Sequence, residues 1–203
     1  MTVSEPTVYI DFLCPWAYRG AVWLAEVEKA GRIRPHFRFF SLSQNHAAHE
    51  GHAQPPVWER DAKAQGLAAF LAATAARAQG EEAGDRFRLA LQIARHQDHL
   101  PVDQHATHRV AAERAGLDVA RWETDLKATD FTTLAQEHAE AVRRGVFGVP
   151  TLVWPEGRSY YVKITDLIPA ERAVPLYDAI ETVHRFREVI EIKTPESEGT
   201  LAA

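Results

Sequence analysis

The sequence predicts an α/β fold in which a mixed four-stranded sheet with flanking helices is interrupted by an all-helical insertion. Two observations support this prediction. Apolar segments with β-strand character occur near the two ends of the chain, whereas the middle repeats apolar residues at helical spacing. Glycine and proline mark the boundaries between these parts. With 203 residues, the chain suits one large domain or a core domain with an insertion.

The first part, residues 1–55, is expected to contain a strand, a helix, a second strand and a loop. Residues 7–13 are mostly β-branched or aromatic, which favours a short buried strand. A helix should begin at Pro15, because proline is favoured at the first helical position, and it should end at Gly31. Residues 33–42 are rich in phenylalanine and predict the second strand.

The middle part, residues 56–145, is expected to be the all-helical insertion. It follows a polar segment, residues 43–58, that is interpreted as a loop. Asp118 is a candidate cap for one helix. Apolar residues on the helical faces, including Phe87 and Trp122, are interpreted as core. No segment here resembles a strand. From the apolar residues that repeat at helical spacing we expect four or five helices.

The last part, residues 146–190, should add a hairpin and a helix. Residues 151–154 and 159–164 predict two strands joined by a turn, and Pro169 lies near the start of an amphipathic helix. Residues 191–203 are expected to be a flexible tail. Without the insertion, the order of elements is β-α-β followed by β-β-α, which is the thioredoxin-like arrangement.

Composition excludes several classes of function. The net charge is −5 and the charged residues are interspersed, which argues against nucleic-acid partners and a polybasic membrane anchor. No apolar run approaches the ~18 residues of a membrane span. The polar N-terminus lacks the basic and apolar regions of a signal peptide. We therefore expect a cytoplasmic protein without a membrane partner.

The single cysteine, Cys14, stands at the predicted start of the first helix. One cysteine excludes an internal disulfide and a cysteine-rich metal site, and a lone cysteine is commonly a small buried hydrophobe. At a helix N-terminus, however, unpaired N–H groups and the helix dipole favour the thiolate. The position therefore predicts a solvent-reachable nucleophile with a pKa below ~8.5. Pro15 would fix the first turn, and Trp16 would shield one side of the sulfur.

A second informative segment, Gly148–Thr151, precedes the predicted third strand. If the Val149–Pro150 bond is cis, the backbone of Val149 is presented to an incoming extended chain. The alternative is an ordinary trans proline at the start of a strand. The segment alone does not decide between them.

Together the two segments resemble a known family. Cys14–Ala17 is similar to the Cys-Pro-x-Cys redox motif, and Gly148–Thr151 is similar to the cis-proline motif. The helical block between them resembles the insertion of DsbA-like thioredoxin-fold proteins, in particular the cytoplasmic bacterial branch with FrnE-type oxidoreductases and hydroxychromene-carboxylate isomerases. The resemblance covers residues 7–188. It implies a sulfur site in which Cys14 lies beside the Val149–Pro150 peptide.

The resemblance also implies roles for individual residues. Cys14 is the catalytic residue, and the substrate-binding residues are Val149, Pro150 and Thr151. One departure is important, because Ala17 replaces the second cysteine of the motif. The chain cannot store an internal disulfide, so an attacked substrate would stay as a mixed disulfide until an external thiol released it. A cysteine-to-alanine substitution made to trap substrates would give the same sequence.

Two groups of histidines raise the question of a metal site. Neither group has a cysteine or a carboxylate nearby at ligand spacing, so both are interpreted as polar loop and exposed helix residues, and no metal is expected. One of them could line the cleft at Cys14 and tune its thiol. The groups are His46, His49 and His52, and His96, His99, His105 and His108.

Three functions remain open from the sequence. The first is a monothiol thiol–disulfide oxidoreductase that acts on small thiols or disulfides, with no tightly bound cofactor and with glutathione or another low-molecular-weight thiol as co-substrate. The second is a transferase or isomerase similar to the kappa class, in which a bound thiol does the chemistry; those relatives usually carry serine at the position of Cys14. The third is a redox-inactive binding module with a thioredoxin fold.

Overall fold

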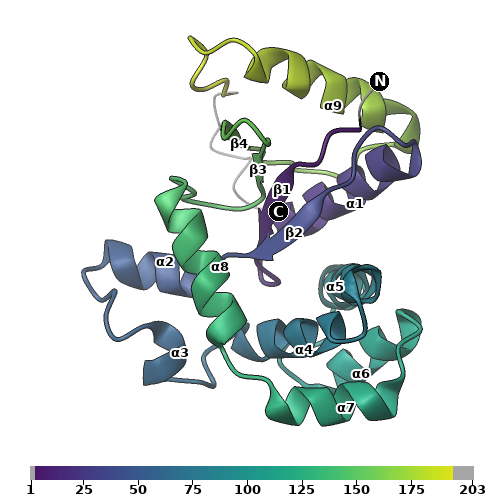
Figure 1. Ribbon diagram of the computed structural model, residues 1–203, viewed down its shortest axis with the longest axis vertical. Helices are drawn as coiled ribbons and strands as arrows, with labels where there is room; N and C mark the ends of the chain where they lie inside the picture. The colour runs from purple at the N-terminus through teal and green to yellow at the C-terminus, as the bar shows by residue number, and fades with distance from the viewer. Residues whose placement is uncertain (1–2, 194–203) are drawn as a thin grey trace.

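The computed structural model of the protein describes residues 3–193. One sheet contains β1 (Thr7–Ile10), β2 (His36–Phe39), β3 (Thr151–Val153) and β4 (Ser159–Tyr161) in the order β2-β1-β3-β4 (Figure 1). β1 is parallel to β2 and antiparallel to β3, and β3 is antiparallel to β4. The mixed sheet predicted from the sequence is confirmed, although each strand is shorter than expected.

The helices follow the predicted order. α1 (Pro15–Lys29) joins β1 to β2, and α9 (Ala170–His184) follows β4. Residues 56–145, which are described throughout, contain helices and no strand, as predicted. They form six helices rather than the expected four or five, because the single-turn α3 is too short to show helical periodicity. The six are α3 (Val57–Arg60), α4 (Leu67–Arg77), α5 (Glu81–His96), α6 (His105–Arg114), α7 (Val119–Ala128) and α8 (Thr132–Arg143).

The interpretation of residues 43–58 as a loop is wrong. This segment contains α2 (Leu42–His49) as well as the start of α3. The Ser41 hydroxyl caps α2 by accepting a hydrogen bond from the Gln44 N–H at 3.1 Å. Because Gln44 is the buried residue of this otherwise partly or fully exposed helix, α2 lacks the apolar periodicity that reveals the other helices.

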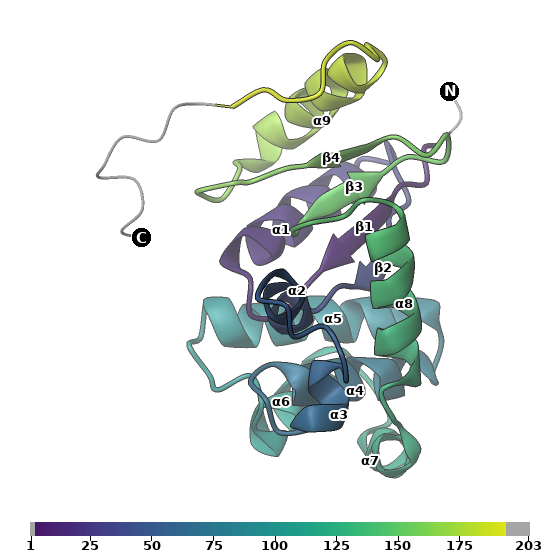
Figure 2. The ribbon, with the colours of Figure 1, turned by 90° about the vertical axis from the view of Figure 1, so that its left-hand side faces the viewer.

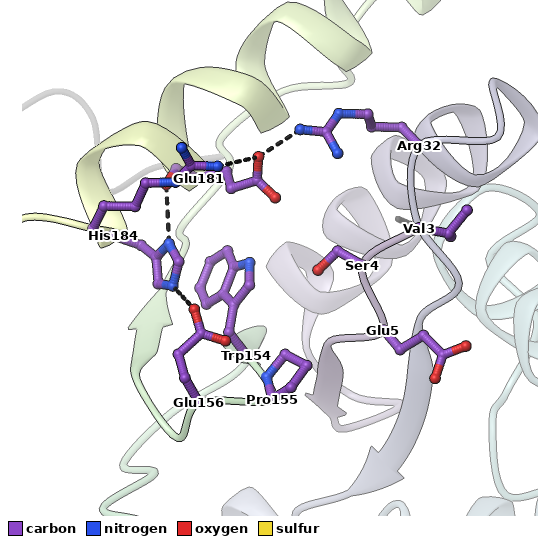
Figure 3. Close-up of a pocket in the computed structure, with 10 residues that line it drawn as sticks. Val3, Ser4, Glu5, Arg32, Trp154, Pro155, Glu156, Glu181 and His184 are labelled. Atoms are coloured by element: carbon purple, nitrogen blue, oxygen red, sulfur yellow. Dashed lines mark hydrogen bonds and ion pairs between the residues drawn. The ribbon is translucent and has the colours of Figure 1, made fainter. Parts of the chain in front are cut away.

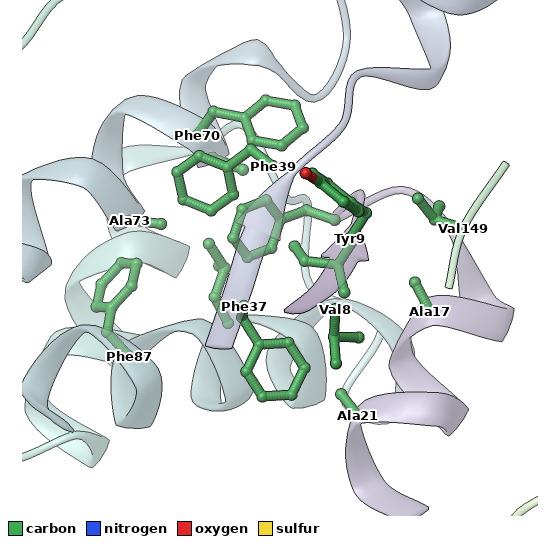
Figure 4. Packing of buried hydrophobic residues seen from close by; sticks show 14 of the residues in the cluster. Val8, Tyr9, Ala17, Ala21, Phe37, Phe39, Phe70, Ala73, Phe87 and Val149 are labelled. Atoms are coloured by element: carbon green, nitrogen blue, oxygen red, sulfur yellow. The ribbon is translucent and has the colours of Figure 1, made fainter. Parts of the chain in front are cut away.

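The insertion and the sheet share one hydrophobic core. Phe12 follows β1, Phe39 lies in β2 and Phe70 lies in α4. Figure 4 shows the rings of Phe39 and Phe70 side by side. The Phe70 ring centroid lies 5.4 Å from that of Phe12 and 5.2 Å from that of Phe39. Fully burying a side chain of this size contributes about 2 kcal/mol. The helical block is thus anchored directly behind the segment that leads to Cys14.

Buried tryptophans connect the helices, and the predicted core position of Trp122 is confirmed. Trp23 of α1 donates a hydrogen bond to the Ala173 carbonyl of α9 at 2.9 Å. Trp122 of α7 donates one to the Ala72 carbonyl of α4 at 3.0 Å. α9 therefore packs on α1, while α4 to α7 gather at the opposite end of the molecule (Figure 2).

The end of the chain is only partly described. Residues 191–193 are exposed and belong to no helix or strand, and the rest of the predicted flexible tail, residues 194–203, lies outside the described residues. Within residues 3–193, no helix is long and apolar enough to cross a membrane.

The Ser41 cap of α2 can be tested by mutation. We expect Ser41→Ala to lower the free energy of unfolding by about 1 kcal/mol, because the Gln44 N–H loses its acceptor. Ser43→Ala makes the same chemical change inside α2 and should alter stability by less than about 0.5 kcal/mol. Denaturant unfolding of both variants measures the difference. Equal losses would contradict the cap.

Candidate active site

Cys14 is the N-cap residue of α1. Its backbone is extended, with φ −84° and ψ 114°, and its Sγ accepts a hydrogen bond from the Ala17 N–H at 3.4 Å. Pro15 occupies the first helical position, where its lack of an N–H leaves no donor unsatisfied. The sequence therefore places the sulfur at the positive end of the helix, as predicted.

The second predicted segment lies directly against this sulfur. The Val149–Pro150 bond is cis, as the motif predicts. The Cys14 thiol donates a hydrogen bond to the Val149 carbonyl, with 3.3 Å between Sγ and oxygen. The N-cap and the loop before β3 thus meet across 135 residues of sequence. The resemblance correctly brought Cys14 together with this peptide.

The prediction of a solvent-reachable thiol with a low pKa is wrong. Cys14 is only 4% exposed. Burial, followed by the nearby Asp11 carboxylate, raises the pKa of its thiol to about 11. The N–H groups of Ala17 and Trp16 and the charge of Arg19 act in the opposite direction but do not outweigh burial. In this state the sulfur carries its proton.

The remaining predicted site residues have different surroundings. Trp16 is partly exposed at the start of α1, whereas Ala17 is fully buried beneath the sulfur's helix turn. Thr151 is 3% exposed, and its hydroxyl donates to the Gly148 carbonyl at 2.7 Å. Thr151 therefore stabilises the turn that presents Val149; its predicted contact with substrate remains a prediction.

Asp11 is a residue of the site that the sequence analysis missed. It is 1% exposed, and its carboxylate accepts hydrogen bonds from the N–H groups of Leu13 and Leu42, both at 2.8 Å. Burial raises its pKa to about 6, although both N–H groups favour the charged form. Asp11 ties the loop before Cys14 to the first turn of α2. The sequence did contain a signal for this role, because Asp11 is an acidic residue within the apolar strand predicted over residues 7–13.

The helix α2 also contacts the other half of the site. Asn45 donates a side-chain hydrogen bond to the Phe147 carbonyl at 3.2 Å. The Phe147 ring is 63% exposed and its centroid lies 5.4 Å from that of Tyr161. Through Asn45 and Leu42, α2 bridges the loop before β3 and the loop before α1.

One histidine reaches the site, as the sequence allowed. His96 donates from Nε2 to the Phe12 carbonyl at 2.9 Å and stacks on Tyr18. Burial lowers the pKa of His96 to about 4, so the ring is neutral and supports the loop before Cys14. Among residues 3–193, no three histidine, cysteine or acidic side chains are grouped to hold a metal ion.

A cavity in the structure is separate from Cys14. It measures about 660 Å³ and lies where Trp154 follows β3, at the end of the sheet opposite Cys14 (Figure 3). His184 stacks on Trp154 there and contacts the Glu156 carboxylate at 2.5 Å, while Arg32 pairs with Glu181. These paired groups join α9 to the hairpin and α1, which is a structural role.

Comparison with known proteins now identifies the family. The profile of the DSBA-like thioredoxin domain matches residues 7–173. The chain belongs to this family. An uncharacterised protein from Mycobacterium tuberculosis is 26% identical over 195 residues, which cover 93% of this chain and 81% of that protein.

Solved structures show the same DsbA-like thioredoxin fold. A 2-hydroxychromene-2-carboxylate isomerase has a TM-score of 0.62 at 16% identity, covering 89% of this chain and 96% of its own. The cytosolic disulfide reductase DsbM from Pseudomonas aeruginosa, solved with GSH, has a TM-score of 0.55 at 17% identity, covering 90% and 100%. The predicted fold and family are confirmed.

The approach of α1 to Pro150 depends on Gly20. A Cβ atom at this position would lie 2.8 Å from Pro150 Cγ. Glycine-to-alanine changes inside helices usually add up to about 1 kcal/mol of stability. We expect Gly20→Ala instead to lose about 1–3 kcal/mol, because the buried proline ring has no room to move. Chemical denaturation measures the change. A gain in stability would contradict this packing.

Proposed function

We propose that this DSBA-like protein is a monothiol thiol–disulfide oxidoreductase with Cys14 as its nucleophile and a low-molecular-weight thiol as its second partner. The observation that carries the proposal is the placement of the lone sulfur between the Ala17 N–H and the Val149 carbonyl. The proposal retains Val149 and Pro150 as the backbone against which substrate binds. A cytosolic location is part of it, supported by the cytosolic DsbM neighbour.

The chemistry consists of two exchanges. In the first, the Cys14 thiol loses its proton, the sulfur attacks a small disulfide, and the leaving thiolate takes up a proton as one S–S bond replaces another. In the second, an external thiol attacks the mixed disulfide, a new disulfide forms and Cys14 regains its proton. No second cysteine is required, which fits alanine at position 17.

Burial of the sulfur favours the adduct over the free thiolate. A pKa of about 11 makes the thiolate roughly a hundredfold rarer near neutral pH than an ordinary thiol would, while its higher basicity recovers about tenfold in nucleophilicity. A mixed disulfide carries no charge and escapes the desolvation cost. The site therefore reacts slowly and holds its product.

A small thiol fits this site better than a second protein thiol does as resolving partner. Cys14 is 4% exposed, and Trp16 in the first turn of its helix is partly exposed. A compact thiol needs less opening of the loop than a folded chain does. The DsbM neighbour was solved with GSH, which supports glutathione as one candidate.

A second function, thiol transfer or isomerisation, is favoured by the protonated state of Cys14. A sulfur that keeps its proton can donate a hydrogen bond to the thiolate of a bound co-substrate, as a hydroxyl would at the same place. The 2-hydroxychromene-2-carboxylate isomerase among the structural neighbours supports isomerisation as the reaction in this alternative. Under it, Cys14 activates a thiol without forming a covalent bond.

Intact-mass analysis after incubation with glutathione disulfide tests the proposal. We expect the wild-type protein to gain one glutathione at Cys14, faster as pH rises toward about 10 because the thiolate fraction grows. Excess free thiol should remove the adduct. Ala17→Cys should shorten its lifetime, because a neighbouring thiol resolves it internally.

Two variants at position 14 separate the alternatives. Cys14→Ser and Cys14→Ala should both fail to form the adduct. If Cys14→Ser instead keeps a glutathione-dependent transferase or isomerase activity that Cys14→Ala lacks, and wild type forms no adduct, the second function is correct. Absence of both adduct and turnover in folded wild-type protein would leave a binding module.

A further inference from the structure

The glycine that precedes α4 packs directly against the residue before Cys14. Gly66 is buried and is the N-cap residue of α4, with φ +87°. A Cβ atom built at Gly66 would lie 2.8 Å from Cδ1 and 2.9 Å from Cγ of Leu13. Both distances are well below the ~3.5–4.0 Å of an ordinary contact between carbon atoms. Glycine is therefore required here both by its backbone conformation and by the closeness of Leu13.

Asp103 holds Gly66 in place. Both oxygens of its carboxylate accept the Gly66 N–H, at 2.9 Å and 3.0 Å. Hydrogen bonds to a charged group are roughly twice as strong as bonds between neutral groups. Asp103 lies between α5 and α6, so it ties the start of α4 to the rest of the helical insertion. Leu13, in contrast, is partly exposed and has room to move toward solvent. If the contact is crowded, Leu13 is the partner that we expect to move.

The backbone of Leu13 belongs to the tight turn that ends at Cys14. The Cys14 N–H donates to the Asp11 carbonyl at 3.2 Å, and the Leu13 N–H donates to the Asp11 carboxylate at 2.8 Å. A displacement of Leu13 is therefore transmitted to Cys14 through a single peptide bond. Any shift of Cys14 changes both the burial of its sulfur and the bond from Sγ to the Val149 carbonyl, which measures 3.3 Å.

We propose that Gly66 and Leu13 are positioning residues whose contact sets the reactivity of Cys14. The inference rests on the proposed function, because it concerns how readily the nucleophile of that reaction forms. While Leu13 rests on Gly66, the turn holds the sulfur buried against the Val149 carbonyl. Displacing Leu13 exposes the sulfur and weakens that bond, and both changes favour the thiolate. The helical insertion thus controls the reactivity of a thiol that belongs to the sheet half of the fold.

The test measures the rate at which iodoacetamide alkylates Cys14 as a function of pH, followed by intact mass. The wild-type protein should show a midpoint at about 11. We expect Gly66→Ala to lower this midpoint by about one pH unit, because the displaced Leu13 leaves the sulfur more exposed. Tenfold more thiolate at neutral pH, offset in part by its lower nucleophilicity, should then make alkylation about threefold faster.

Gly80→Ala is the matched control for this variant. Gly80 is the N-cap residue of α5 and also has a positive φ, +115°, but no other described residue lies within 4 Å of a Cβ atom built there. The substitution therefore strains the backbone at a helix start without touching the turn at Cys14. It should lower stability and leave the alkylation midpoint at its wild-type value. Equal midpoint shifts in the two glycine variants would overturn the inference.

A double substitution tests whether the two residues act through their contact. The Leu13 atoms nearest to the added Cβ are Cδ1, Cγ and Cδ2, and alanine lacks all three. Leu13→Ala should itself lower the midpoint, because the turn loses its support on Gly66. Adding Gly66→Ala to Leu13→Ala should then change the midpoint by less than about 0.3 pH unit. A full second shift, or an unchanged midpoint in Leu13→Ala, would contradict the positioning role. If Gly66→Ala does not fold, Leu13→Ala decides alone.

Failure of the proposed function is distinguishable from failure of this inference, because alkylation requires no disulfide. The same variants are incubated with glutathione disulfide and examined by intact mass. If the alkylation midpoints follow the Leu13–Gly66 contact but no variant gains a glutathione, the positioning role stands and covalent exchange fails. If adducts form at Cys14 but the midpoints do not depend on this contact, exchange stands and the inference is overturned.

Discussion

The hydrogen bond from the Cys14 thiol to the Val149 carbonyl is the contact on which the site depends. It joins the start of α1 to the loop before β3, two segments that are separated by 135 residues in the sequence. Gly20 allows α1 to approach Pro150, and Asp11 fixes the loop that leads to Cys14. A shift of either segment by about 1 Å would break a bond of this length.

This contact also explains how a single thiol can serve as a slow, adduct-forming group. The Val149 carbonyl is an acceptor, so it stabilises the protonated sulfur and opposes the thiolate. The N–H groups of Ala17 and Trp16 and the charge of Arg19 support negative charge on the same atom, but together they do not offset burial. The neutral states, thiol and mixed disulfide, are therefore both favoured over the charged intermediate that connects them.

The sequence predicted the parts of the structure that depend on local pattern. Helical periodicity identified the insertion, and the two motifs brought Cys14 to Val149. The helix α2 was missed because its stability comes from the Ser41 cap and from the Asp11 carboxylate at Leu42, which leave no apolar stripe. Its role in bridging the two halves of the site therefore became visible only in three dimensions.

The error about the thiol pKa has a different cause. The helix N-terminus is a local feature and was placed correctly, whereas burial depends on how distant segments cover the sulfur. Cys14 is 4% exposed in the folded chain, and desolvation then dominates the helix dipole. The four-residue motif alone does not show how deeply the sulfur is buried.

The most direct measurement is the infrared S–H stretching band of Cys14. Because the chain has one cysteine, the difference spectrum between wild type and Cys14→Ala reports this thiol alone. The account predicts a band shifted to lower frequency by the hydrogen bond to Val149, persisting through about pH 9 and fading toward about pH 11. A band already absent at neutral pH, or one at the frequency of a free thiol, would contradict the account.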